Sequence, residues 1–335
     1  MATREYKSVR SVYGKTLAEL GRNNKNIVVL DADVSCSTQT QIFAKEFPER
    51  FFDIGIAEQD MMTTAAGLAC TGKTVFVSTF AMFAAGRAWE QIRNTICYSN
   101  LNVKIVATHG GITVGEDGAS HQALEDIALM RAIPNMRVIV PADATETKQA
   151  LEYAAKEYGP FYIRIARSNL PDIFDEKTYK FDINKATTIQ EGNDLTIITN
   201  GETLVEAIDC GTMLKEKGIS AEIISVPTIK PLDADTIIKS AMKTRKVVTI
   251  DNHSIIGGLG SAVCELLSEK YPVPIKRIGT YDVFGQSGTA NELMDYYGLN
   301  AKKLAQTIME YLNKWYNSET YTKNIKIITH CKIST

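Results

Sequence analysis

One pattern recurs along most of this chain: a short run of apolar residues is followed by a helical segment or a glycine-rich turn. In the first half, these runs lie at Ile27–Leu30, Phe51–Ile54, Thr74–Val77, Val103–Ala107, Arg137–Val140 and Phe161–Ile165. Short strands that are apolar throughout and separated by helices are typical of parallel sheets covered on both faces. The pattern therefore predicts an α/β fold built from doubly wound sheets.

A polar stretch at Ser168–Asn193 has little periodicity and is interpreted as a linker. The pattern then resumes, with strands at Leu195–Thr199, Ala221–Val226, Lys246–Ile250 and Ile275–Ile278 and helices near Thr203–Lys217, Asp233–Met242, Leu259–Lys270 and Asn300–Leu312. We therefore predict two α/β domains, residues 1–180 and the smaller 190–313, followed by a loosely attached tail at 314–335.

Two helices of the first half have recognisable signals. Asp143 and Glu146 are spaced as in a capping box, which predicts that a helix begins there. A helix from Arg87 is expected because three apolar side chains fall on one of its faces: Trp89, Ile92 and Ile96.

The composition excludes several classes of protein. The 335 residues are 44% hydrophobic and 23% charged, which is enough for two globular domains. The net charge of −2 gives no basic field for nucleic acid or a membrane surface. No apolar run approaches a membrane span and the start is charged, so we expect a cytoplasmic protein. The six cysteines lack Cys-x-x-Cys spacing, which favours reduced thiols.

Glu58 stands out because it follows a predicted strand and lies at the start of a helix of small and apolar residues, Ala57–Ala69. The N-terminus of a helix favours a carboxylate, whereas dry surroundings favour the neutral acid. An acid under these two opposing influences is a candidate for proton chemistry. The alternative is that Glu58 only complements the helix dipole.

Ligands of open parallel sheets bind beyond the carboxyl ends of the strands. Side chains suited to binding follow four consecutive predicted strands: Asp33 and Ser37, then Glu58, then Phe80 and Phe83, then His109, Asp117 and His121. Residues 109–121, which we call the histidine loop, contain four glycines that permit close backbone approach to a ligand. Neither histidine has a third ligand at metal-binding spacing, so we predict a ligand site and no metal ligands.

Several separate segments, in this order, resemble the pyrimidine-binding domain of transketolases: Arg50–Gln59, Ser78–Phe83, Thr108–Gln122 and Ile133–Asp143. A later segment resembles a motif of their C-terminal domain: Val283–Gly288. The resemblance implies a pyrimidine-binding domain at residues 1–180 and a transketolase C-terminal domain at 190–313. It also implies thiamine diphosphate as the cofactor and transfer of a two-carbon ketol unit between phosphorylated sugars.

The resemblance implies roles for the residues that face the cofactor. Glu58 matches the acid that hydrogen-bonds to the pyrimidine N1′ and promotes the imino form of the 4′-amino group. Phe80 and Phe83 match the aromatic pocket around the pyrimidine, although Ala85-Gly86 stand where the family often has a further aromatic. Asp33 resembles an acid beside the cofactor, and an Asx turn is the alternative.

The resemblance also implies contacts to the sugar. His109 and His121 resemble histidines that contact sugar oxygens, and with Glu58 they are the catalytic candidates. Asp117 resembles the acid that recognises a substrate hydroxyl. A surface or helix-capping position is the alternative for each histidine.

Three further residues resemble contacts to the substrate phosphate: Arg10, Ser37 and Arg167. Arginine suits this task because its planar donors engage two phosphate oxygens at once. The alternatives are salt bridges for the two arginines and a turn for Ser37.

Transketolases hold the diphosphate and its metal through a Gly-Asp-Gly motif in an N-terminal domain, and this chain contains no Gly-Asp-Gly. We therefore expect the C-terminal half of a split transketolase, active only with a separate N-terminal subunit. That partner would hold the Mg²⁺ or Ca²⁺ ion, and a homodimeric contact would give a heterotetramer. The small-residue helix after Glu58 would permit a close approach at the interface.

Three alternatives remain at this stage. A 1-deoxyxylulose-5-phosphate synthase shares the glutamate and histidine-loop pattern, and the beta subunit of a 2-oxoacid dehydrogenase has the same two domains. The beta subunit would lack the sugar-binding His109 and the phosphate-binding Arg167. The third alternative is a catalytically silent binding or regulatory module, for which Glu58→Ala would leave function intact.

Overall fold

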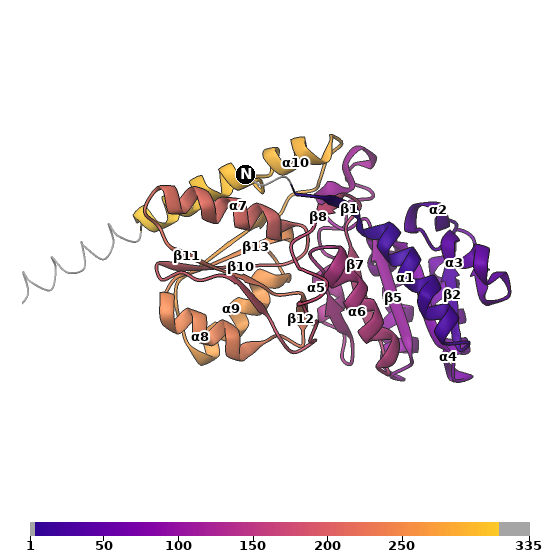
Figure 1. Ribbon diagram of the computed structural model, residues 1–335. Coiled ribbons are helices and arrows are strands. Elements are labelled where there is room, and N and C mark those ends of the chain that lie inside the picture. The colour runs from indigo at the N-terminus through magenta and orange to yellow at the C-terminus, as the bar shows by residue number, and fades with distance from the viewer. Residues whose placement is uncertain (1–3, 315–335) are drawn as a thin grey trace, which may run out of the picture.

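The computed structural model describes residues 4–314, which form two large sheets beside each other (Figure 1). The first sheet has seven strands in the order β12-β6-β7-β5-β4-β2-β3. Its strands are β2 (Ile27–Asp31), β3 (Phe51–Asp53), β4 (Thr74–Phe80), β5 (Val103–Thr108), β6 (Arg137–Ile139), β7 (Phe161–Ile165) and β12 (Thr228–Lys230). All neighbours in this sheet are parallel except β12 and β6, which confirms the predicted parallel arrangement.

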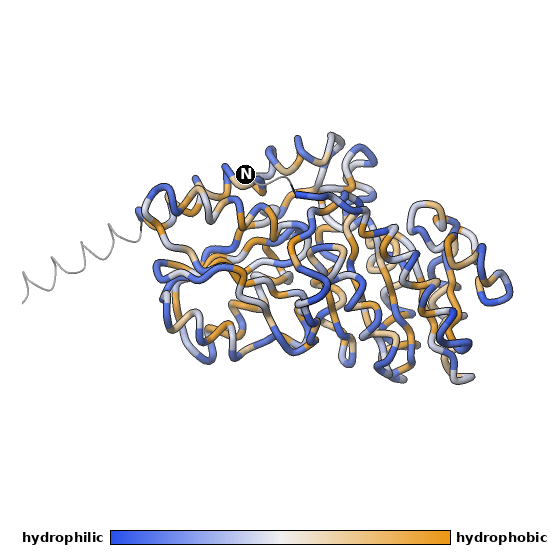
Figure 2. The backbone as a smooth tube through the Cα atoms, viewed as in Figure 1, coloured by the Kyte–Doolittle hydropathy of each residue, from blue (hydrophilic) through white to orange (hydrophobic). Residues whose placement is uncertain are grey.

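Successive residues of a strand point to opposite sides of the sheet. Because consecutive residues of these strands are apolar, both faces of the sheet are apolar and helices cover both. Ile27 and Val29 pack in one core cluster, with α1 (Val9–Asn23), α3 (Gln41–Glu46) and α6 (Ala144–Lys156). Val28 and Leu30 pack in another, with α4 (Glu58–Cys70) and α5 (Asp126–Arg131). Apolar residues accordingly concentrate along the strands, whereas many of the outer turns are hydrophilic (Figure 2).

The second sheet has five strands in the order β14-β13-β10-β11-β9. Its strands are β9 (Thr187–Gln190), β10 (Leu195–Thr199), β11 (Ala221–Ser225), β13 (Val247–Ser254) and β14 (Ile275–Thr280). The helices are α7 (Thr203–Glu216), α8 (Ala234–Thr244), α9 (Leu259–Lys270), α10 (Ala290–Tyr296) and a helix over 301–314. Strand β13 continues past the predicted end at Ile250, through buried polar residues that a search for apolar runs does not detect.

The two sheets are joined by more than the chain connection. Strand β12 comes from the second half of the chain but pairs antiparallel with β6 of the first sheet. Lys230 donates from Nζ to the carbonyl oxygens of Arg131 and Ile133 at 2.9 and 2.6 Å. One core cluster runs from Met61 of α4 to Val263 of α9, so the two halves share a continuous apolar interior.

The predicted linker contains two short strands, β8 (Asn169–Pro171) and the β9 strand of the second sheet. It is also attached to α6, because Asp143 Oδ2 accepts hydrogen bonds from the backbone N of Ile173 and Phe174 at 2.9 and 2.7 Å. Sequence periodicity did not reveal these contacts, since they are made by side chains and backbone groups distant in the chain. The domain boundaries themselves stay a prediction.

The two predicted helix signals differ in outcome. Asp143 caps α6 as expected, accepting from Glu146 N at 2.8 Å, but the Glu146 carboxylate bonds to Ala142 N instead of Asp143 N. The capping box is therefore only half formed. The helix expected from Arg87 is not a single α-helix: the π-helical η2 (Phe83–Arg87) ends at that residue, and the π-helical η3 (Gln91–Cys97) follows it. Its predicted apolar face is nevertheless directed inward.

No helix within residues 4–314 combines the length and the apolar character needed to cross a membrane. The five cysteines within this range are free. The predicted tail at 314–335 lies, beyond its first residue, outside the described residues.

Candidate active site

The C-terminal ends of β2, β4, β5 and β7 lie along one edge of the first sheet and bring the predicted residues together. In the sheet register, Phe80 is opposite Thr108, and Thr108 is opposite Ile165. His109 comes one residue after Thr108, and Arg167 comes two residues after Ile165. Parallel pairing therefore converts residues far apart in the sequence into neighbours at a single edge.

Two phenylalanines and two histidines form a ring cluster at this edge. The Phe80 and His109 rings are stacked with centroids 3.9 Å apart, and Phe80 and Phe83 are stacked at 5.9 Å. His121 meets Phe83 edge-on at 5.3 Å. The two ends of the histidine loop, His109 and His121, thus contact Phe80 at the end of β4 and Phe83 just after it.

Glu58 is the first residue of α4 and is only 2% exposed. Its Oε2 atom is buried and has no hydrogen-bond partner among the described residues. The nearest opposite charge is Arg87, whose Nη1 lies 3.7 Å from this oxygen and whose guanidinium carbon is 5.8 Å from the Phe83 ring centre. A buried acceptor without a donor is costly unless a ligand supplies one, so Glu58 is a candidate ligand-binding acid.

Arg87 was not among the predicted site residues. It directly follows Ala85-Gly86, where the expected further aromatic is absent, and it lies over both Glu58 and Phe83. The sequence signal that could have identified Arg87 is a cationic residue shortly after the aromatic segment Ser78–Phe83. That signal is weak because half of the Arg87 side chain is exposed and exposed arginines are common.

His109 is unusual in its backbone conformation and in its pKa. Its backbone has a positive φ of 61°, its side chain is 3% exposed, and its Nδ1 shares a 2.7 Å hydrogen bond with the Thr108 hydroxyl. Burial, followed by the positive charges of Arg10 and Arg167, lowers the pKa of His109 to about 3. The imidazole is therefore neutral at physiological pH and can both donate and accept hydrogen bonds.

Arg10 and Arg167 are brought together by a small ribbon. Strand β1 (Tyr6–Ser8) pairs antiparallel with β8, which aligns Ser8 with Asn169. Arg10 donates from Nη1 to the Ser37 carbonyl oxygen at 2.8 Å, while its Nε is buried without a partner. Burial and the charge of Arg167 lower the pKa of Arg10. Arg167 Nη1 forms the salt bridge that was its alternative, with Glu116 Oε2 at 2.9 Å, so the unused donor suited to an anion is Arg10 Nε.

The remaining predicted residues are Ser37, Asp117 and Asp33. Ser37 meets Arg10 through its backbone carbonyl, and its side chain is half-buried. Asp117 and Asp33 are exposed and lie outside the ring cluster. An Asx turn was the alternative for Asp33, but the side chain that accepts from the local backbone is that of Asp31, whose Oδ1 accepts from Val34 N at 2.8 Å.

The histidine loop also contacts the second half of the chain. Ile112 N donates to Asn252 Oδ1 at 3.0 Å, and the Thr113 hydroxyl donates to Glu202 Oε1 at 2.8 Å. Gln122, just beyond the loop, donates from Nε2 to the Gln286 carbonyl oxygen at 3.0 Å. Asn252, Glu202 and Gln286 carry no sequence signal for this role, because they contact the loop from a distant part of the chain.

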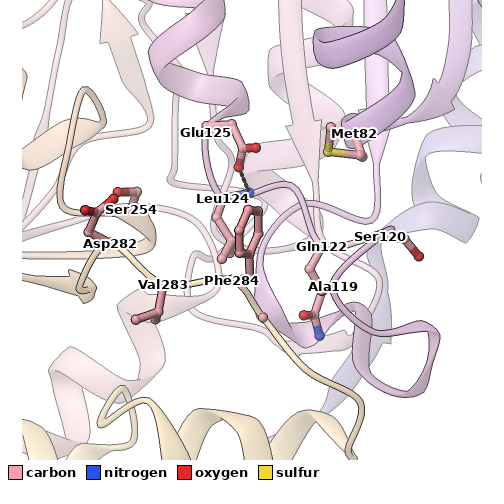
Figure 3. Close-up of a pocket in the computed structure, with 11 residues that line it drawn as sticks. Met82, Ala119, Ser120, Gln122, Leu124, Glu125, Ser254, Asp282, Val283 and Phe284 are labelled. Carbon is pink, nitrogen blue, oxygen red and sulfur yellow. Dashed lines mark hydrogen bonds between the residues drawn. The ribbon is translucent and has the colours of Figure 1, made fainter.

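A cavity lies between the two halves directly beside the histidine loop (Figure 3). The loop contributes Ala119 and Ser120, and the second half contributes Val283 and the ring of Phe284. Phe284 is 86% exposed, so its ring does not close the cavity. Among residues 4–314, no group of three or more His, Cys, Asp or Glu side chains is arranged to hold a metal ion.

Comparison with known proteins decides the family. The sequence matches the transketolase pyrimidine-binding domain over residues 5–172 and the transketolase C-terminal domain over residues 184–304. The chain belongs to the transketolase family. Both matched domains are those of the C-terminal half of transketolase, and the candidate site occupies the first of them.

Relatives of similar length support this placement. A putative transketolase C-terminal section of Methanocaldococcus jannaschii is 56% identical over 92% of this chain and 98% of its own length. A subunit of the apulose-4-phosphate transketolase of Phocaeicola vulgatus is 40% identical over 91% of this chain and 97% of its own. A solved structure described as a split gene transketolase, inactive beta4 tetramer, superposes with a TM-score of 0.85 at 50% identity, covering 92% of this chain and 99% of that one.

Proposed function

We propose that this chain is the C-terminal subunit of a thiamine-diphosphate-dependent transketolase that transfers a two-carbon ketol unit between phosphorylated sugars. The observation that carries the proposal is Glu58: a buried carboxylate oxygen without a donor at the edge of an aromatic cluster. Membership of the transketolase family supports the same cofactor. Glu58 and Phe83 supply the carboxyl group and the apolar wall that an aminopyrimidine ring requires.

Within this proposal, each residue has one task. When bound, thiamine diphosphate supplies a carbanion at its thiazolium C2. The Glu58 carboxyl group would share its proton with the lone pair of the pyrimidine N1′, and the buried setting would strengthen this hydrogen bond. Phe80 and Phe83 stack against the ring and exclude water, a contribution of about 0.5–1.5 kcal/mol for each ring pair. Asp33 would approach the cofactor from the solvent side.

The sugar phosphate would lie between the histidine loop and the arginine pair. Arg10 and Arg167 would bind its phosphate, with Ser37 orienting Arg10 through its backbone carbonyl. His109, being neutral, would exchange hydrogen bonds with a sugar hydroxyl, and His121 would contact the sugar beside it. Asp117 would recognise a further hydroxyl once the substrate is bound.

The matched domains do not include the diphosphate-binding domain of the family, so we propose a second polypeptide as its carrier. That N-terminal subunit would hold the diphosphate and its Mg²⁺ or Ca²⁺ ion, and two copies of each chain would form a heterotetramer. The relatives named as a C-terminal section and as one subunit of a transketolase support a divided enzyme. On α4 after Glu58, the exposed Thr63 and Gly67 would be available for the contact, whereas Ala65, Ala66 and Ala69 are buried in the core of this chain.

Reconstitution tests this proposal. We expect no turnover from the purified chain alone and thiamine-dependent ketol transfer after addition of an N-terminal transketolase subunit. Ribose 5-phosphate should serve as acceptor in that mixture, whereas a 2-oxoacid dehydrogenase subunit would require pyruvate. Full turnover by the isolated chain would contradict the division into subunits, and pyruvate-specific activity would contradict the reaction.

The physiological ketose need not be one of the pentose phosphate pathway. A relative 40% identical to this chain is named for apulose 4-phosphate. The Arg10 and Arg167 pair recognises a phosphate and does not by itself fix the carbon skeleton. Comparing xylulose 5-phosphate with other phosphorylated ketoses as donors would identify the substrate.

A further inference from the structure

The first turn of the histidine loop has an uncommon backbone conformation, supported within the first half of the chain by the 2.9 Å bond from Gly111 N to the Ala123 carbonyl oxygen. His109 has a φ of 61°, which is uncommon for a residue with a Cβ atom, and Gly111 has a φ of 80°. Such conformations persist where surrounding contacts determine them. The turn at His109 is therefore expected to depend on the side chains that pack against it.

The side chain of Asn252 contacts this turn. A Cβ atom added to Gly111 would lie 2.3 Å from Asn252 Nδ2, so the loop backbone is in close contact with this amide. Asn252 Oδ1 accepts from Ile112 N at 3.0 Å. The Asn252 side chain therefore contacts two consecutive loop residues, and the second of them lies three positions after His109.

Glu202 completes this contact. Its Oε1 accepts from Asn252 Nδ2 at 2.5 Å and from the Thr113 hydroxyl at 2.8 Å. Asn252, Glu202 and Thr113 are 2%, 8% and 4% exposed, so these bonds form where water does not compete. Asn252 is on β13 and Glu202 precedes α7, so both belong to the second half of the chain.

We propose that Asn252 and Glu202 are positioning residues through which the second domain holds His109 against Phe80. The buried amide and carboxylate fix Ile112 and Thr113, and this fixes the turn that starts at His109. The fixed turn keeps the imidazole stacked on the Phe80 ring, 3.9 Å between centroids. The second domain thus takes part in the site of the first through the histidine loop.

The direct test is the histidine spectrum of the isolated chain. The ¹H signal at Cε1 of His109, assigned with His109→Phe, should be displaced by the magnetic shielding of the Phe80 ring. We expect Asn252→Ala to move this signal toward that of an unstacked histidine. Glu202→Gln should keep it near the wild-type position, because the amide oxygen can still accept from Thr113 and Asn252.

Two further variants separate positioning from general loosening of the domain contact. Arg131→Gln removes a different contact between the halves, the bond from Nη1 to the Gly257 carbonyl oxygen at 3.1 Å. It should lower the melting temperature without moving the His109 signal. If Asn252→Ala does not fold, Thr113→Val removes one bond from the loop side and should cause a smaller shift in the same direction.

The kinetic readout rests on the proposed function. In the reconstituted complex, Asn252→Ala should lower kcat/KM for the phosphorylated ketose roughly 10- to 100-fold and leave the KM for thiamine diphosphate unchanged. An unmoved His109 signal in Asn252→Ala, or an equal shift in Arg131→Gln, would overturn the positioning role. Absence of ketol transfer in the wild-type complex would instead overturn the proposed function, while the spectrum would still decide the inference.

Discussion

Arg87 Nη1 lies 3.7 Å from Oε2 of Glu58, the buried carboxylate oxygen that has no hydrogen-bond partner among the described residues. The distance is that of an ion pair without a hydrogen bond. The Arg87 guanidinium carbon also lies 5.8 Å from the centre of the Phe83 ring, so Arg87 contacts both the acid and the aromatic residue proposed for the cofactor. Arg87 is therefore expected to compete with the cofactor for Glu58.

Arg87→Gln should lower the KM for thiamine diphosphate in the reconstituted complex by about two- to fivefold. The reason is that a half-exposed ion pair contributes only about 0.2–1 kcal/mol, and this is the energy that the cofactor must overcome. Cofactor titration of ketol transfer checks it, with Arg93→Gln on the neighbouring exposed turn as the control. A raised KM in Arg87→Gln would mean that Arg87 assists cofactor binding.

Arg167→Met should reduce kcat/KM for a phosphorylated ketose by about 10- to 100-fold, since a hydrogen bond to a charged group contributes about 1.5–3 kcal/mol. The same variant should leave an unphosphorylated donor, such as hydroxypyruvate, almost unaffected. Arg22→Met, which removes a surface pair with Glu46, is the matched control. Equal losses for both donors would place Arg167 in a structural role.

The strands were predictable from sequence because they are short and mainly apolar: Ile27–Leu30 is apolar throughout, and Leu195–Thr199 is apolar apart from two threonines. The convergence of Phe80, His109 and Arg167 followed from the rule for parallel strands. The contact of Asn252 with the histidine loop did not follow, since it depends on how two domains pack. The pairing of β12 with β6 of the first sheet was not predictable either, because it joins strands from distant parts of the chain.

Acid should destabilise the protein through His109. Its pKa is about 3 in the folded chain, whereas an unfolded histidine titrates near 6.5. Between these values the unfolded state binds a proton that the folded state does not. Stability from this group is therefore complete above pH 6.5 and is lost as the pH falls toward 3, at about 1.4 kcal/mol per pH unit.

Urea unfolding at pH 7 and pH 5 measures this effect. The loss of free energy of unfolding between the two pH values should be greater in wild type than in His109→Asn, because asparagine does not titrate and tolerates a positive φ. Parallel losses in the two proteins would show that His109 is not held neutral by its surroundings.

Glu58 is central to the proposed function, and the alternative is that it only complements the dipole of α4. Asp60 provides the matched control, because it is an exposed acid in the same first turn of this helix. A dipole role would be shared by both acids, since each lies close to the same N-terminal charge. A role in cofactor activation belongs to Glu58 alone.

The most direct measurement is therefore the rate at which the C2 proton of thiamine diphosphate exchanges for deuterium in the reconstituted complex, followed by NMR after acid quench. Glu58→Gln should slow this exchange by about 10²- to 10⁴-fold, whereas Asp60→Asn should leave it unchanged. Exchange at the wild-type rate in a folded Glu58→Gln complex would contradict the account.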